Sequence, residues 1–214
     1  MFRPRKPFVR DFQNCVRIHS RGYLPHWEAA DGIYFITFRL ADSLPREVVE
    51  SLKRQREEIE QKRRRDRGRL SLIDRQEISR LYSLRVDHYL DAGSGECELR
   101  DPRAARIVVD ALRFFDETRY QLKSFCVMPN HVHVIMRPTG DWLLKRILFS
   151  WKSYTSHEIN KVLGRKGQLW QEEYYDHLIR DEQELLELTD YVANTPVKAG
   201  LVDWPWVGLE GDDR

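Results

Sequence analysis

Two apolar segments joined by a short turn constrain this sequence most, because together they predict a β-hairpin. Residues 122–128 are expected to form one strand, Pro129-Asn130 the turn, and residues 131–137 the returning strand. Side chains alternate between the two faces of a strand, so His131 and His133 are expected on one face. The hairpin therefore predicts a sheet that presents two potential metal ligands. The spacing alone leaves a purely structural role for both histidines open.

The remaining elements predict an α+β fold. Residues 33–40 and 173–180 are rich in β-branched and aromatic side chains and are expected to be strands. We expect Pro196 to end the last helix. The order of elements predicts an antiparallel sheet with helices packed on one face. The expected helices run from Pro45 to Gly68, over 70–92, from Asp101 to Phe115, from Leu144 to Gly164, and from Asp181, which begins a capping box, to Pro196.

Composition predicts a globular chain with strong local charge. Of its 214 residues, 41% are hydrophobic, and 36 lysines and arginines are set against 34 aspartates and glutamates. Residues 53–69 form a basic segment that can neutralise phosphates, the alternative being a solvated helix with internal ion pairs. We expect an irregular N-terminal arm at 1–30, one domain at 31–206 with a charged helical insertion at 53–100, and a C-terminal tail at 207–214.

Several protein classes are disfavoured by this sequence. No apolar run approaches the roughly 18 residues of a membrane span, and the N-terminus lacks the apolar core of a secretory signal, so a cytoplasmic location without membrane contact is expected. The odd and widely spaced Cys15, Cys97 and Cys126 fit neither a disulfide framework nor a zinc knuckle, and Cys126 is expected in the core. The lack of a glycine-rich phosphate loop argues against kinase or dehydrogenase chemistry.

A tyrosine on the last predicted helix is a further candidate for chemistry. Leu185, Leu188 and Val192 form the apolar stripe of this helix, and Tyr191 lies at the edge of the stripe. A tyrosine in that position keeps its hydroxyl in contact with water. On helical spacing alone, the alternative is an amphipathic side chain that caps the core.

Three sequence blocks in a defined order identify a resemblance to a known family. They are Val127-Met128-Pro129-Asn130-His131-Val132-His133, then residues 169–180, then residues 190–202. Together they resemble the REP-associated tyrosine transposases, which are single-tyrosine HUH transposases related to small insertion-sequence transposases. The resemblance covers about residues 31–206 and implies a ferredoxin-like fold. The charged piece around 53–95 lies outside the compact core of the smallest members.

The resemblance implies roles for individual residues. His131 and His133 would hold a divalent metal, Mg²⁺ or Mn²⁺, and Tyr191 would be the nucleophile. A phenol has a pKa near 10, so it needs a base or a cation that stabilises the transition state. A third metal ligand is expected one turn after Tyr191, at Thr195. Because related sequences often have asparagine before the proline, Thr195, Asn194 and water stay open for this position.

The implied function is a metal-dependent DNA strand transferase and nuclease. Such an enzyme cleaves and rejoins single-stranded DNA with hairpins, formed by palindromic repeats, through a 5′-phosphotyrosine. The alternative is a domesticated DNA-binding protein without cleavage activity. A relaxase or a hydrolase of small molecules matches less well, because the chain lacks a helicase motif and a convincing carboxylate cluster. The sequence leaves a homodimer open, and with it whether one chain or two build the site.

Other side chains compete for roles near the site. Tyr154, expected on the apolar stripe of its helix, and Tyr174-Tyr175 rank below Tyr191 as nucleophiles. His177 is expected either to support a metal ligand or to pair locally with Asp176. Three tryptophans are candidates for stacking on unpaired bases, with core packing as the alternative: Trp142, Trp151 and Trp170.

Overall fold

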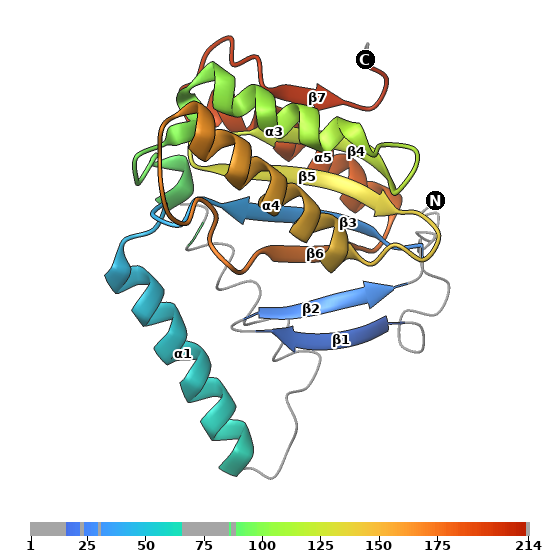
Figure 1. The fold of residues 1–214 in the computed structure, drawn as a ribbon. Helices are drawn as coiled ribbons and strands as arrows, with labels where there is room; N and C mark the ends of the chain where they lie inside the picture. The colour runs from blue at the N-terminus through green and yellow to red at the C-terminus, as the bar shows by residue number, and fades with distance from the viewer. Residues whose placement is uncertain (1–15, 22–23, 30, 66–85, 87–88, 213–214) are drawn as a thin grey trace.

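A five-stranded antiparallel sheet forms the centre of the protein (Figure 1). The computed structural model describes residues 16–21, 24–29, 31–65, 86 and 89–212. Strands follow the order β6-β3-β5-β4-β7 across the sheet. The predicted hairpin is confirmed as β4 and β5, in which Val127 lies opposite Val132. The strands are β3 (Ile33–Arg39), β4 (Tyr120–Val127), β5 (His131–Pro138), β6 (Tyr175–Ile179) and β7 (Val207–Leu209).

The connections between these strands follow the ferredoxin-like pattern. Along the chain, β3, α3 (Pro102–Phe114), β4, β5, α4 (Leu144–Val162) and β6 alternate as β-α-β-β-α-β. β3 and β5 occupy the middle of the sheet, so β5 separates β3 from β4. This topology confirms the predicted α+β class and the antiparallel sheet.

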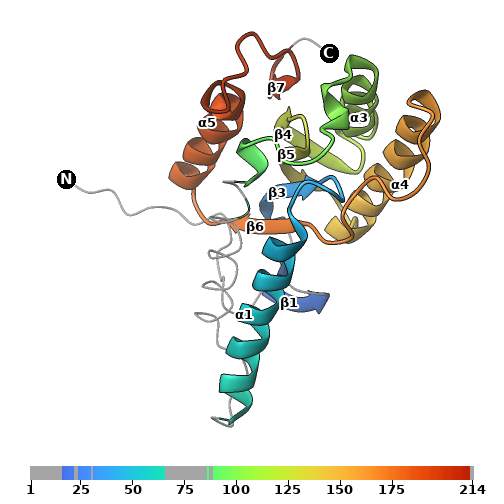
Figure 2. The same cartoon turned by 90° about the vertical axis from the view of Figure 1, so that its left-hand side faces the viewer.

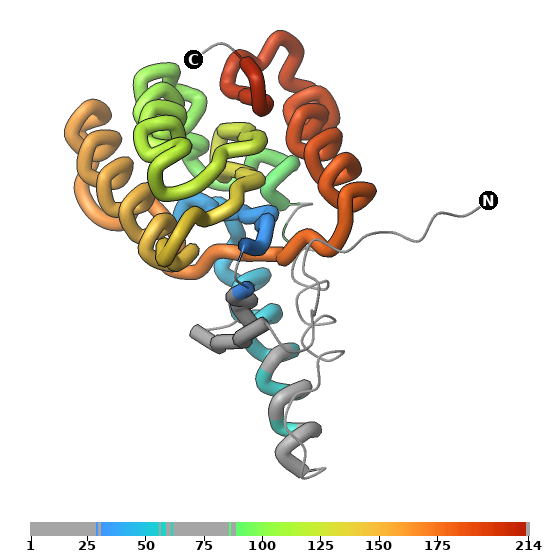
Figure 3. Tube along the Cα trace, turned by 90° about the vertical axis from the view of Figure 1, so that its right-hand side faces the viewer, coloured from blue at the N-terminus to red at the C-terminus, as the bar shows by residue number. Residues whose placement is uncertain are grey.

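Helices cover both faces of the sheet. α3 and α4 lie on one face, as predicted, whereas α5 (Glu182–Lys198) lies on the other (Figures 2 and 3). Ile36 and Val134 point toward α3 and α4, while Phe35 and Ile135 point toward α5. The central strands are apolar on both sides, so a single helical layer would leave one apolar face in water. The second layer also brings α5 over the face that carries the histidines.

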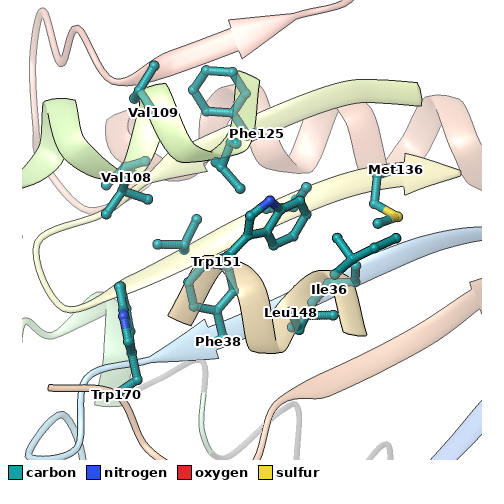
Figure 4. Packing of buried hydrophobic residues seen from close by; sticks show 14 of the residues in the cluster. Ile36, Phe38, Val108, Val109, Phe125, Met136, Leu148, Trp151 and Trp170 are labelled. Atoms are coloured by element: carbon teal, nitrogen blue, oxygen red, sulfur yellow. The ribbon is translucent and has the colours of Figure 1, made fainter. Parts of the chain in front are cut away.

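The larger core fills the space between the sheet and helices α3 and α4 (Figure 4). The ring of Phe38 stacks on Trp151 at 6.3 Å and meets Trp170 edge-on at 4.9 Å. The indole of Trp151 donates to the hydroxyl of Tyr120 (3.0 Å), which donates to the carbonyl of Leu112 (2.8 Å). Trp151 and Trp170 are therefore buried core residues and do not form a base-stacking surface.

The apolar stripe of α4 departs from the prediction at one position. Tyr154 is 54% exposed, whereas the neighbouring Thr155 is buried. The hydroxyl of Thr155 donates to the carbonyl of Trp151 (2.7 Å) and accepts from the indole of Trp170 (2.8 Å). The expectation that Tyr154 lies on the buried stripe is thus wrong, because a hydrogen-bonded threonine satisfies the buried indole there. Cys126 is fully buried, as predicted.

Helix starts follow the predicted caps, but one helix end does not. Asp101 accepts from the Arg103 amide and begins α3, and Asp181 begins α5 in the same way. The prediction that Pro196 ends α5 is wrong, because the helix continues to Lys198. Proline removes one backbone donor, but hydrogen bonding continues beyond it, because the amides of Ala199 and Leu201 donate to the carbonyls of Thr195 (3.1 Å) and Pro196 (2.8 Å). Gly200, with φ of 74°, follows the helix end in the left-handed conformation.

Segments around the sheet differ from or extend the expectations. The arm expected to be irregular contains paired strands β1 (Val16–Arg21) and β2 (Leu24–Ala29), and the expected tail begins with β7, which pairs with β4. Helix α1 (Arg46–Arg65) begins the charged segment and projects away from the sheet (Figure 2). The helix expected at 70–92 lies largely outside the described residues, and the short helix η1 (Glu98–Arg100) precedes α3. Within the described ranges, no helix combines the length and apolarity needed to cross a membrane.

Candidate active site

The two histidines of β5 lie side by side on the face covered by α5. Their Nε2 atoms are 3.0 Å apart, and both side chains are fully buried. Two nitrogen ligands about 2.1 Å from one octahedral cation, at right angles to each other, are separated by about 3.0 Å. The distance between His131 and His133 therefore fits two ligands of one metal ion. It also fits a hydrogen bond between the rings when one Nε2 carries a proton.

The Nδ1 atom of each imidazole, called the outer nitrogen below, forms a hydrogen bond with another side chain. The side-chain Nδ2 of Asn130 donates to the Ser94 carbonyl (2.9 Å). The side-chain Oδ1 of Asn130 is thereby free to accept from Nδ1 of His131 (2.7 Å). Nδ1 of His133 lies 2.8 Å from the hydroxyl of Thr37. An imidazole with its proton on Nδ1 presents an unprotonated Nε2, the form that binds metals. Asn130 selects this form of His131, and Thr37 can accept the proton that gives the same form of His133.

Burial keeps both imidazoles neutral. It lowers the pKa of His133 to about 3. Burial, together with the neighbouring His133, lowers the pKa of His131 well below its ordinary value. Neutral imidazole nitrogens are suitable ligands for a divalent cation. In the part of the chain that the structure describes, there is no group of three or more histidine, cysteine, aspartate or glutamate side chains that could hold a metal, so the histidine pair has no third ligand of these types.

The structure brings Tyr191 to the histidine pair from α5. Its ring meets the ring of His133 edge-on, with 5.4 Å between centroids, and the ring of Phe35 at 5.9 Å. The ammonium of Lys198 lies 5.1 Å from the centroid of the Tyr191 ring. Lys198 was not identified from the sequence, although its position two helical turns after Tyr191 was a usable signal. One chain therefore brings the two histidines and the phenol together.

The two residues considered as a third ligand face different environments. Thr195 is buried, and its hydroxyl donates to the carbonyl of Tyr191 (2.7 Å). Asn194 is exposed, and its amide donates to the carbonyl of Asp190 (2.8 Å). Of the two, only Thr195 shares the buried side of α5, one turn after Tyr191. Its hydroxyl oxygen retains lone pairs after donating its proton.

Tyr175 is a second phenol on the same face of the sheet. Its backbone pairs with Thr37, and Thr37 pairs with His133 on the other side, so the three residues form a row across β6, β3 and β5. The ring of Tyr175 meets Phe35 edge-on at 6.3 Å. An intervening strand thus separates Tyr175 from His133, whereas the ring of Tyr191 packs directly against it.

His177 connects β6 to the start of α5. Its Nε2 lies 2.9 Å from the carboxylate of Glu184, so its partner is not the adjacent Asp176, which points to the other face. The same carboxylate accepts from the backbone and guanidinium of Arg180 (2.7 and 2.8 Å). Burial opposes the ionisation of Glu184, but hydrogen bonds from His177 and Arg180 outweigh it and hold the pKa well below its ordinary value. These bonds fix the first turn of the helix that carries Tyr191.

Comparison with known proteins gives this arrangement a family context. Residues 106–195, which include both histidines and Tyr191, match the family model described as transposase IS200 like. Over this segment the chain is similar to the IS200-like transposases. It is 28% identical over 107 residues to a Haemophilus influenzae protein whose name assigns it provisionally to the REP-associated tyrosine transposases. It is also 28% identical over 98 residues to the REP-associated tyrosine transposase of Escherichia coli.

These relatives confirm the resemblance predicted from the sequence. The alignments cover 44% of this chain in both cases, and 61% and 56% of the respective relatives. The chain thus spans about three fifths of the length of the curated relatives that it matches. A solved structure of a REP-associated tyrosine transposase bound to a REP hairpin aligns with 88% of this chain and 80% of its own, with 19% identity and a TM-score of 0.47.

Proposed function

We propose that this protein is a metal-dependent nuclease and strand transferase for single-stranded, hairpin-containing DNA, with Tyr191 as the nucleophile. The observation that carries the proposal is the packing of the Tyr191 ring against His133, beside two convergent Nε2 atoms. The curated relatives add support, because their names associate them with REP sequences. REP sequences are palindromic repeats, and a single strand of a palindrome pairs with itself to form a hairpin.

His131 and His133 are the proposed ligands of a divalent cation, Mg²⁺ or Mn²⁺, with Thr195 and water as further ligands. When bound, such a cation would polarise the scissile phosphate and stabilise the charge that develops during displacement. Asn130 and Thr37 orient the imidazoles through their outer nitrogens. Burial disfavours a second proton on either ring, so the two Nε2 lone pairs stay available at neutral pH.

Tyr191 is proposed to attack the phosphorus through its phenol oxygen. As the new O–P bond forms, the bond from phosphorus to the 3′ oxygen breaks, the phenol releases its proton and the 3′ oxygen gains one. The products are a 5′-phosphotyrosine and a free 3′-hydroxyl. Attack by a 3′-hydroxyl reverses the step without ATP, which permits strand transfer. The Lys198 ammonium lies over the Tyr191 ring, 5.1 Å from its centroid, and its positive charge would stabilise the negative charge that develops on the phenol.

A covalent-adduct assay tests this proposal. The full chain is incubated with Mg²⁺ or Mn²⁺ and a pool of labelled single-stranded hairpin oligonucleotides with randomised flanks. We expect a protein–DNA adduct that maps to Tyr191 and disappears in Tyr191→Phe, while folding and DNA binding persist. Tyr175→Phe is the matched control, since it removes a phenol from the same face and should retain the adduct.

Two outcomes would change the proposal. An adduct that persists in Tyr191→Phe rejects this residue as the nucleophile. DNA binding without any metal-dependent cleavage by the unaltered chain supports the domesticated DNA-binding protein instead.

A further inference from the structure

A buried arginine lies next to the histidine pair. Arg39, the last residue of β3, is only 5% exposed, and its backbone pairs with that of His131. Residues directly opposite each other in antiparallel strands point to the same face of the sheet. The neighbouring pair in this register, Thr37 and His133, is joined by a hydrogen bond of 2.8 Å. Arg39 and His131 are therefore cross-strand neighbours on the α5 face.

The contacts of Arg39 do not balance its charge. Its Nη1 atom reaches the hydroxyl of Ser43 at 3.2 Å and the carbonyl of Leu40 at 3.4 Å. Its Nε atom is buried without a hydrogen-bond partner. No carboxylate of the described residues forms an ion pair with this guanidinium. Because buried charges in folded proteins are normally paired, we expect the Arg39 guanidinium to bind an anion.

A second, half-buried cation lies near the same end of β3. The ammonium of Lys152 on α4 donates to the carbonyls of Gln171 and Glu172 (2.6 Å each), and the Gln171 amide donates to the Arg39 carbonyl (2.9 Å). Burial lowers the pKa of Lys152 to about 8; the charge of Arg39 adds to this effect, and Glu172 opposes it. Two cations therefore lie near this end of β3, and Glu172 offsets the charge of one of them.

We propose that Arg39 binds a backbone phosphate of the DNA strand beside the histidine pair. This inference rests on the proposed function, which supplies single-stranded DNA as the ligand. A guanidinium presents a planar fork of N–H donors that matches phosphate oxygens, and such contacts fix the position of a strand without reading its sequence. The phosphate supplies the anion that Arg39 lacks, and it lies next to His131.

DNA binding by the Tyr191→Phe chain, which should form no covalent adduct, tests this role. This variant is the parent in the measurements that follow. Fluorescence anisotropy with the labelled hairpin pool is measured across a series of salt concentrations. Adding Arg39→Gln should weaken binding about tenfold or more, because a charge-assisted hydrogen bond is lost. It should also reduce the slope of log affinity against log salt by about 0.7, the value for one phosphate contact on a single strand. Arg137→Gln is the matched control, since Arg137 lies on the same face near the other end of β5 and should change neither quantity comparably.

Thermal unfolding separates ligand binding from a structural role. Without ligand, Arg39→Gln should unfold at the same or a higher temperature than the parent, because it removes an unpaired buried charge. Inorganic phosphate should raise the unfolding temperature of the parent more than that of the variant. A lower unfolding temperature with an unchanged salt slope would assign Arg39 a structural role and overturn the inference.

The two proposals fail in different ways. If the parent binds DNA and Arg39→Gln alters neither the affinity nor the slope, the phosphate contact is rejected and the proposed function stands. If the parent binds no DNA but phosphate protects it through Arg39, the phosphate site stands and the proposed function is rejected.

Discussion

The two faces of the sheet use the same strands for different purposes. On the α3/α4 face, β3 contributes Phe38, which packs between two buried tryptophans. On the α5 face, the same strand places Thr37 and Arg39 opposite His133 and His131. The first face gains stability from apolar burial, whereas the second buries polar groups that cost free energy unless each finds a partner. We infer that stability and chemistry are concentrated on opposite faces, and this separation can be tested.

The largest expected effect on stability comes from the apolar face. Phe38→Ala removes a ring from the centre of the core and should lower the free energy of unfolding by about 3–5 kcal/mol. Denaturant unfolding measures this loss. Adduct formation per folded molecule, assayed at low temperature, should stay close to that of the unaltered chain. An equal loss of adduct per folded molecule would contradict the separation of the two faces.

The reverse pattern is expected for the histidine pair. His131→Asn should slow adduct formation about 10³-fold, equivalent to about 4 kcal/mol, because a bound cation contributes several kcal/mol of transition-state stabilisation. Its free energy of unfolding at neutral pH should change much less than in Phe38→Ala. The rate is measured against metal concentration. His157→Asn, at an exposed position on α4, serves as the control, and an equal effect there would contradict a special role for His131.

Stability should depend on pH through the same two histidines. Unfolded histidines take up protons near pH 6.5, whereas burial keeps the pKa of folded His133 at about 3 and that of His131 well below its ordinary value. The unfolded state therefore binds more protons as the pH falls. Between pH 6.5 and 5, the free energy of unfolding should drop by about 2 kcal/mol for each histidine. Urea unfolding at several pH values measures the drop, and a double substitution to asparagine should largely remove it.

A smaller effect is expected at the residue that holds the outer nitrogen of His133. Thr37→Val keeps the shape of the side chain but removes the hydroxyl, which should weaken metal affinity about tenfold. The affinity is obtained from the metal dependence of adduct formation. Thr37→Ser restores the hydroxyl and should recover most of the affinity. Equal affinities for the valine and threonine proteins would show that this hydrogen bond does not support the histidine.

Local patterns predicted only part of the site. The spacing of His131 and His133 was sufficient to place both on one face, because it depends only on the geometry of a strand. Thr37 lies 96 residues from His133, and their contact depends on the register between β3 and β5, which no local pattern specifies. The position of Arg39 beside His131 also depends on the register between β3 and β5, so it could not be predicted from a local pattern either. The place of Tyr191 was implied by family resemblance, since the edge of a helical stripe does not reveal what the helix packs against.

The errors in the fold also come from tertiary packing that overrides local rules. Pro196 carries a strong signal for a helix end, yet α5 continues past it to Lys198 with the proline side chain buried. Tyr154 fits the helical period of an apolar stripe, but Thr155 satisfies the Trp170 indole and occupies the buried position. The second helical layer was missed for a similar reason, since strands that are apolar on both faces do not indicate which helix covers which side.

The hydrogen bond between Asn130 and the Ser94 carbonyl has a consequence for the charged segment. The chain leaves the sheet after Arg39, forms α1, and returns through Ser94 to the residue that orients His131. Both attachment points of this excursion thus border the imidazole pair. The orientation of one proposed metal ligand therefore depends on a backbone carbonyl that lies 36 residues earlier in the sequence than the asparagine it holds.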